Sequence, residues 1–127
     1  MRKIVIDMQN YLFADAVATA FKNSDYDIEV IRAESPRDTV ELCQVYESFA
    51  LVMEVTGYTP WKLSERLKLR DQVRELCPDC KIALMVDSNT ERQAAKDIRD
   101  AKKNGLIDQF FYGSMTAEYL MDQIYAM

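Results

Sequence analysis

Residues 82–112, IALMVDSNTERQAAKDIRDAKKNGLIDQFFY, contain the pattern that decides the fold. Two apolar runs, Ile82–Val86 and Ile107–Tyr112, enclose a long charged segment. Their apolarity is continuous rather than alternating, which is typical of parallel strands buried on both faces. We therefore predict two parallel strands joined by a crossover.

The charged segment between these runs has the start and stop signals of a helix. Ser88 and Glu91 fit a capping box, in which each side chain bonds a backbone N–H of the first turn. The helix is expected to run to about Lys103, where Asn104-Gly105 supplies a left-handed stop. Residues 82–112 therefore form a strand, a helix and a second strand.

The same alternation extends over the rest of the chain. Three further apolar runs are predicted strands: Ile4–Ile6, Ile28–Ile31 and Ala50–Val55. The first helix is expected to bury one stripe with a 3.6-residue period, formed by Leu12, Phe13, Ala16, Val17, Ala20 and Phe21. Ser35-Pro36 predicts the start of the second helix, and Ser114 is expected to cap the last helix.

Five strand–helix units in 127 residues predict a single α/β domain over residues 1–127. The expected fold is flavodoxin-like: a doubly wound, five-stranded parallel sheet of order 2-1-3-4-5 with helices on both faces. Function in such sheets lies at the carboxyl ends of the strands. The predicted pocket is therefore formed at the ends of four of the strands.

Composition excludes several classes of function. The formal net charge of −5 gives no electrostatic footprint for nucleic acid. Apolar runs are far too short to span a membrane, and the chain enters a strand at once without a signal peptide, so we expect a cytoplasmic protein. Because the chain has no histidine, Ser-His and Cys-His catalysis and most zinc sites are excluded, and we expect no enzymatic activity.

Four stretches resemble, in order, the receiver domains of two-component response regulators. KIVIDMQNYLF (3–13) is similar to the family's first strand and acidic loop, and ALVMEV (50–55) to the third strand, which ends in the phospho-accepting aspartate. CPDCKIALMVDSN (77–89) is similar to the fourth strand with its preceding turn. AKKNGLIDQFFYGSMTAEYL (101–120) is similar to the closing helix, glycine, fifth strand and helix. The resemblance covers nearly the whole chain and implies a role in phosphorelay signalling.

The residues that transfer phosphoryl groups in this family are largely replaced. Two adjacent acids after the first strand help to hold Mg²⁺ in the family; here Asp7 matches one and Met8 stands at the other. Glu54 stands at the phosphoacceptor, one methylene longer than aspartate. A reacting oxygen displaced by more than about an ångström costs orders of magnitude in rate.

The remaining family positions have also changed. The small hydroxyl residue at the end of the fourth strand falls on Val86 or Asp87, with Ser88 two residues beyond the strand. Tyr112 stands where the family has its lysine, and Gly113 where it has a proline. Phosphoryl transfer needs a divalent cation and a second positive charge. The resemblance therefore predicts a pseudo-receiver, in which Glu54 imitates a modified acceptor, and leaves a phosphorylation-competent receiver as the alternative.

Asp7, Glu54 and Asp87 could also converge on Mg²⁺ or Ca²⁺ without any phosphorylation, with Asp7 and Glu54 as the first ligands. No other cofactor is expected, and a small-ligand or metal-binding domain of the same fold stays open. Cys77 and Cys80 have C-x-x-C spacing, but they close a helix instead of opening one, so we expect ordinary thiols. The loop 56–63 contains the only tryptophan and suits either a partner or a lid on the next helix.

The expected partner is a protein, and a homodimer is one form that it could take. The fourth helix, fifth strand and fifth helix form the family's usual dimer surface. In this chain that surface mixes five basic residues with four acidic ones, which could pair across a two-fold axis: Arg92, Lys96, Arg99, Lys102 and Lys103 with Asp97, Asp100, Asp108 and Asp122.

Overall fold

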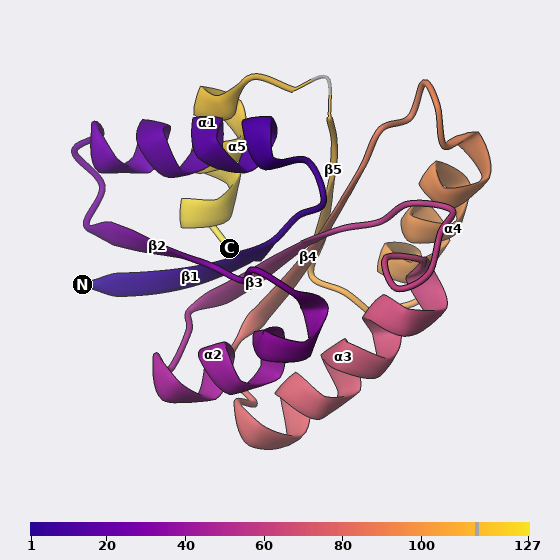
Figure 1. Cartoon of the computed structure of the whole chain (residues 1–127), viewed down its shortest axis with the longest axis horizontal. Coiled ribbons are helices and arrows are strands. Elements are labelled where there is room, and N and C mark those ends of the chain that lie inside the picture. The colour runs from indigo at the N-terminus through magenta and orange to yellow at the C-terminus, as the bar shows by residue number, and fades with distance from the viewer. Residues whose placement is uncertain (114) are drawn as a thin grey trace.

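A computed structural model of the chain describes residues 1–113 and 115–127 and shows five strands alternating with helices (Figure 1). The elements are, in order, β1 (Arg2–Asp7), α1 (Tyr11–Lys22), β2 (Ile28–Arg32), a short 3-10 helix (Pro36–Asp38), α2 (Thr39–Val45), β3 (Ala50–Glu54), α3 (Leu63–Leu76), β4 (Lys81–Val86), α4 (Arg92–Lys103), β5 (Gln109–Tyr112) and α5 (Ala117–Tyr125). All five predicted strands are present.

The strands form one sheet of order β2-β1-β3-β4-β5, and every neighbouring pair is parallel. The predicted topology is thus confirmed. In the central pairing, Ile4 of β1 lies beside Ala50 of β3, and Glu54 at the end of β3 lies beside Met85 of β4. The carboxyl ends of β1, β3 and β4 therefore meet at one edge of the sheet.

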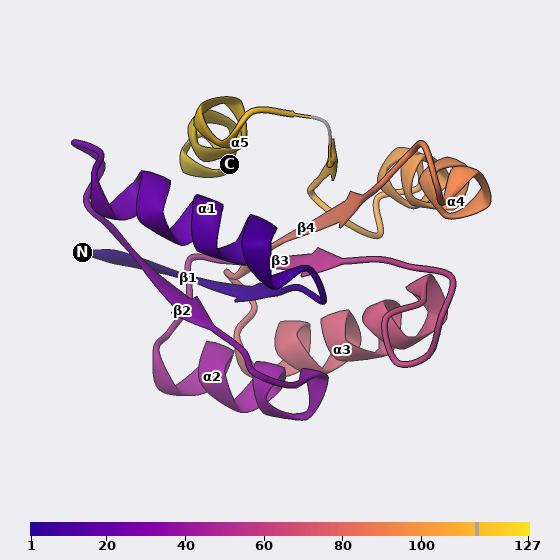
Figure 2. The ribbon, with the colours of Figure 1, turned by 45° about the horizontal axis from the view of Figure 1, so that its top comes forward.

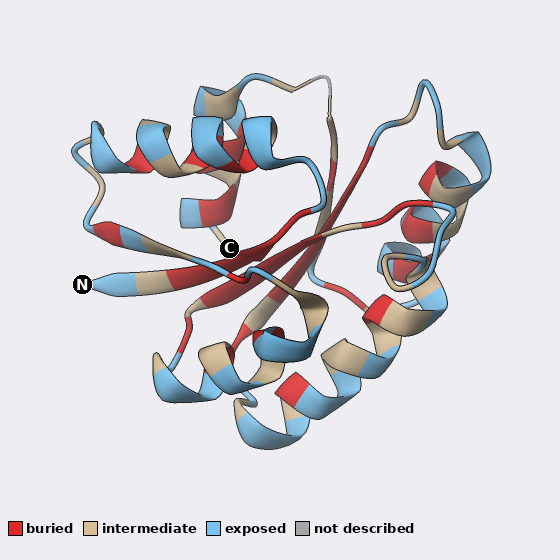
Figure 3. Cartoon of the chain, viewed as in Figure 1, coloured by how far each residue is buried: buried red, intermediate tan, exposed pale blue. Residues whose placement is uncertain are grey.

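Helices cover both faces of the sheet, α1 and α5 on one side and α2, α3 and α4 on the other (Figure 2). Alternate residues of each central strand belong to different cores: Ile4 and Ile6 face α1 and α5, whereas Val5 faces α2 and α3. Burial on both faces explains why the strands read as continuous apolar runs. Figure 3 shows this pattern, with buried residues concentrated on the strands. Across the part of the chain described, no helix has the length and apolarity to cross a membrane.

The buried face of α1 differs in phase from the prediction. Val17 and Phe21 are buried as expected, but Ala14 joins them and Ala16 is exposed. The side chain of Leu12 is 84% exposed. The predicted stripe was too wide because Leu12 and Ala16 point to solvent, whereas Phe13, Val17, Ala20 and Phe21 pack on the core.

One predicted helix start is wrong, and one stop is confirmed. Helix α4 begins at Arg92, after a turn in which the side chain of Asp87, not Ser88, accepts a backbone N–H. It ends as predicted, with Asn104 at the C-cap and Gly105 at φ +76°. The expected cap Ser114 lies outside the described residues. Helix α5 is capped by Thr116, whose hydroxyl accepts the N–H of Tyr119.

Candidate functional site

A cavity of about 200 Å³ lies at the carboxyl ends of the strands. It is lined by residues that follow β1, β3, β4 and β5: Asn10, Phe13, Glu54, Met85, Val86, Asp87, Asn89 and Gly113. Two of the predicted site residues, Glu54 and Asp87, meet here. The lining contains two carboxylates and no basic side chain.

Glu54 is half-buried at the end of β3 and reaches across to the start of α1. Its Oε1 accepts the backbone N–H of Asn10 at 2.9 Å. Asn10 is also the N-cap of α1, and its Oδ1 accepts the N–H of Phe13 at 3.1 Å. The carboxylate therefore lies at the positive end of the α1 helix dipole.

Asp87 contributes the second carboxylate of the cavity from the turn after β4. Its side chain is exposed, and Oδ1 accepts the N–H of Asn89 at 3.0 Å. This is the local Asx-turn bond that fixes many aspartates in loops. Ser88 is half-buried in the same turn. Asp87 thus adds negative charge beside Glu54 while it shapes the β4–α4 loop.

Asp7 does not line this cavity, because its carboxylate is bound within the α2–α3 side of the domain. Arg66 of α3 donates from Nη1 to Asp7 Oδ2 at 2.7 Å and from Nη2 to Oδ1 at 3.3 Å. Thr39 donates its hydroxyl to the same Oδ2 at 2.7 Å. Asp7 is 2% exposed and Arg66 is fully buried.

Arg66 also fastens the ends of two strands. Its Nη2 donates to the carbonyl of Asp7 at 3.2 Å and its Nε to the carbonyl of Glu54 at 2.8 Å. One guanidinium therefore connects α3 to the last residues of β1 and β3. No buried side-chain nitrogen or oxygen in the described part of the chain lacks a partner.

This arrangement gives no support to the hypothesis that Asp7 and Glu54 share a cation. The guanidinium and the Thr39 hydroxyl occupy the Asp7 carboxylate, while Glu54 bonds the start of α1. Over residues 1–113 and 115–127, no group of three or more cysteine or acidic residues is arranged to hold a metal ion. Met8, at the second acidic position, is buried in the core under α1 and α5.

Tyr112 ends β5 with an aromatic ring. It is half-buried, packs on the core beneath α4 and meets Phe110 edge to face, with ring centroids 5.6 Å apart. It is not among the residues that line the cavity. The strand-end edge therefore gains no positive charge from β5.

Comparison with known proteins gives matches in structure only. No family model and no curated protein sequence matches the chain. A response regulator from Thermotoga maritima matches with a TM-score of 0.78 at 16% identity, covering 99% of this chain and 96% of that one. The fold is that of a response-regulator receiver.

Two further structures show the same similarity. The response regulator TrrA from Thermotoga maritima, in complex with Mg²⁺-BeF, has a TM-score of 0.73 at 13% identity. The chemotaxis protein CheY4 from Vibrio cholerae has a TM-score of 0.72 at 14% identity. Both alignments cover 99% of this chain and 98% of the other. The receiver fold is therefore matched over almost its entire length.

Within this receiver fold, the feature that sequence reasoning missed is Arg66. A signal was present: Leu63, Arg66 and Val73 are spaced i, i+3 and i+10 along α3, so the arginine falls among apolar residues on the inward side. An arginine in that phase either extends to solvent or finds a buried acid. Only the fold showed that Asp7 is the acid within reach.

The cysteines lie toward the opposite end of the sheet, and all three are free thiols. Cys77 is the C-cap residue of α3, as the prediction that it closes a helix requires. Hydrogen bonding to Cys80 and burial raise the pKa of Cys43. The thiol of Cys80 is hydrogen-bonded to Cys43 and lies 3.2 Å from the Ser48 hydroxyl. These two contacts lower the pKa of Cys80.

The loop between β3 and α3 folds back on itself. The backbone N–H of Trp61 donates to the carbonyl of Tyr58 at 2.8 Å, and the backbone carbonyl of Trp61 accepts the N–H of Thr56 at 3.1 Å. Trp61 is half-buried, whereas Tyr58 is 71% exposed. The tryptophan thus belongs to a closed loop, and the tyrosine is the aromatic residue it presents to solvent.

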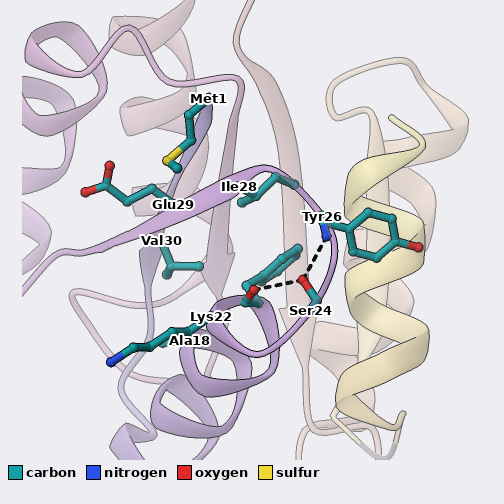
Figure 4. A pocket seen from close by; sticks show the side chains of 9 residues that line it. Met1, Ala18, Lys22, Ser24, Tyr26, Ile28, Glu29 and Val30 are labelled. Carbon is teal, nitrogen blue, oxygen red and sulfur yellow. Dashed lines mark hydrogen bonds between the residues drawn. The ribbon is translucent and has the colours of Figure 1, made fainter.

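A larger cavity of about 500 Å³ lies between the end of α1 and the edge strand β2, away from the strand-end acids (Figure 4). Its wall includes Phe21, Ile28 and Val30. Ser24 on this wall is already bonded: its hydroxyl donates to the Phe21 carbonyl at 2.8 Å and accepts the N–H of Tyr26 at 3.2 Å. The cavity offers mostly apolar surface and no arranged set of reactive groups.

Proposed function

We propose that this chain is a pseudo-receiver: a signalling module of a two-component or transcription-control pathway that acts through protein contacts without ordinary aspartyl phosphorylation. The observation that carries the proposal is the ion pair between Arg66 and Asp7. It occupies the acid that a Mg²⁺ ion would need, with an arginine that is itself fully buried.

The charge of the strand-end cavity supports the same conclusion. A phosphoryl group entering it would meet the carboxylates of Glu54 and Asp87 and no basic lining residue. Transfer to a carboxylate requires cations that balance charge on the equatorial oxygens. Met8 and Tyr112 bring an apolar and an aromatic side chain where the family brings an acid and a lysine.

Incubation with acetyl phosphate and Mg²⁺, followed by intact-mass measurement, tests the proposal. We expect no addition of a phosphoryl group to the native chain. The triple variant Met8→Asp/Glu54→Asp/Tyr112→Lys restores the family residues and is the matched comparison. A mass increase of one phosphoryl group on the native chain, lost in Glu54→Gln, would instead support the phosphorylation-competent alternative.

Glu54 provides the constitutive signal in this proposal. Its bond to the Asn10 N–H involves a charged acceptor, and such bonds contribute about 1.5–3 kcal/mol. That range corresponds to a shift of about tenfold or more in a two-state equilibrium. The bond joins the end of β3 to the start of α1, so its loss removes a direct link between these two elements.

The variant Glu54→Ala should therefore change dimerisation or partner affinity while the far-ultraviolet circular dichroism stays native. Asp87→Ala is the matched control, because it removes the other carboxylate of the same cavity without breaking a bond to α1. If both variants keep the oligomeric state and partner affinity of the native chain, Glu54 has no signalling role.

The proposed partner surface is formed by α4, β5 and α5, and one form of it is a homodimer. Sedimentation velocity at several protein concentrations measures this association directly. A small-ligand domain of the same fold is the remaining alternative. A ligand that raises the melting temperature of the native chain but not of Glu54→Ala would support it.

A further inference from the structure

One side of α4 carries a line of four basic residues. Arg92, Lys96, Arg99 and Lys103 are spaced i, i+4, i+7 and i+11 and are all exposed. At 3.6 residues per turn they fall within an arc of about 60° and span about 16 Å along the helix. We call these four residues the basic stripe.

The stripe points away from the domain. The buried residues of α4 are Ala95, Ile98 and Ala101, which are centred about 130° around the helix from the stripe. In both ribbon views α4 stands at the end of the molecule opposite the N-terminus (Figures 1 and 2). The whole stripe is therefore accessible to another molecule.

Three of the four acids of this region are engaged elsewhere, and the fourth, Asp100, is exposed on α4 at i+4 from Lys96. Asp97 accepts from Gln93, Asp108 pairs with Arg74 and accepts the N–H of Ile82, and Asp122 accepts from the Tyr26 hydroxyl. In the part of the chain that the structure describes, every ion pair involves residues outside the stripe. Like charges at i, i+4 destabilise a helix. Repulsion within the stripe therefore destabilises α4 in the isolated chain, and an acidic partner would offset that repulsion.

The stripe is also opposite in sign to the rest of the protein. Residues 92–103 contain five basic and two acidic residues, a net charge of +3, in a chain whose net charge is −5. All other residues together therefore carry −8. A long polyanion such as duplex DNA would lie against this negative surface as well, whereas a short acidic segment can stay on α4.

We propose that the basic stripe binds an acidic helix of a partner protein, with aspartate or glutamate at i, i+4, i+7 and i+11. A helix laid along α4 would repeat the spacing of the stripe and place one carboxylate beside each cation. This rests on the proposed function and deepens it, because it names the chemistry of the partner.

A fluorescein-labelled, alanine-rich peptide with four glutamates at this spacing is the probe, and anisotropy with the full chain is the measurement. The quadruple variant Arg92→Gln/Lys96→Gln/Arg99→Gln/Lys103→Gln should bind about tenfold more weakly or worse, as expected for four exposed pairs. Raising NaCl from about 0.05 M to about 0.5 M should remove most of the native affinity.

The matched control removes four exposed cations from other elements: Lys22→Gln/Arg37→Gln/Lys62→Gln/Lys68→Gln. It should keep the native affinity, and a peptide with its glutamates spread around the helix should bind more weakly. Equal losses in the two quadruple variants would overturn the proposal, since net charge alone would then explain binding. So would tighter binding of duplex DNA, or a native dimer that the stripe variant dissolves.

The assay needs neither Mg²⁺ nor a phosphodonor, so its outcome is separate from the phosphorylation test. A phosphoryl adduct would refute the pseudo-receiver and leave peptide binding unchanged. Failure to bind the peptide would refute the acidic-helix partner and leave the mass result unchanged.

Discussion

Arg66→Met tests the ion pair that sets the chemistry of the strand-end edge. Methionine keeps an unbranched apolar stem in the core and removes the guanidinium. Asp7 then keeps only the hydroxyl of Thr39, at 2.7 Å, and the carbonyls of Asp7 and Glu54 lose one donor each. An uncompensated buried charge typically costs about 3–5 kcal/mol. A domain of this size has only about 5–15 kcal/mol of stability, so the change should be large.

Urea unfolding followed by circular dichroism measures the loss as a lower midpoint at unchanged slope. Arg74→Met is the matched control on the same helix: Arg74 is partly exposed and lies 3.7 Å from Asp108. Exposed pairs contribute about 0–1 kcal/mol, so this variant should stay within that range.

A double variant that also removes the second charge of the pair tests whether stability is restored. Asp7→Asn/Arg66→Met removes both charges and should recover a substantial part of the stability lost in Arg66→Met, because no unpaired carboxylate remains. If Arg66→Met costs less than about 1 kcal/mol, or the double variant is no more stable than the single one, the buried pair does not hold this edge together.

Three further changes test other parts of the structure. Thr116→Ala should lower the free energy of unfolding by about 1 kcal/mol, measured in urea, because the hydroxyl caps α5. Leu12→Glu should leave the melting temperature near native, whereas Val17→Glu should prevent stable folding, since only Val17 is buried. In native protein, Cys77 should react with a thiol reagent before the two buried cysteines do. Burial raises the pKa of the Cys77 thiol above its ordinary value, so its rate should still increase at pH values where the rate of the urea-unfolded chain has levelled off.

Much of the fold followed from local patterns. Continuous apolar runs mark strands buried on both faces, and Asn104-Gly105 ended α4 where predicted. Helix starts were less predictable, because several residues near each start could serve as the cap. The N-cap residue of α4 is Glu91, which makes no side-chain cap bond, and Thr116 caps α5.

The predicted site was recovered in part. Sequence order and parallel topology place Glu54 and Asp87 at one edge, and the cavity lined by both is present. Asp7 ends β1 at the same edge of the sheet, but its side chain is bonded to Arg66 of α3. Alternation along β1 puts Asp7 on the same face as Val5, toward α2 and α3, so its side was predictable and only its partner Arg66 was not.

The sequence by itself determined the strand–helix alternation, the absence of histidine chemistry and the presence of Met8 and Tyr112 at two strand ends. These are properties of residue type and spacing. Only the tertiary structure decided that Arg66 neutralises Asp7 and that Glu54 bonds the start of α1. Both contacts join residues more than forty positions apart, so no local pattern specifies them. Burial makes them strong, because a charge removed from water must be matched by the groups that the fold brings to it.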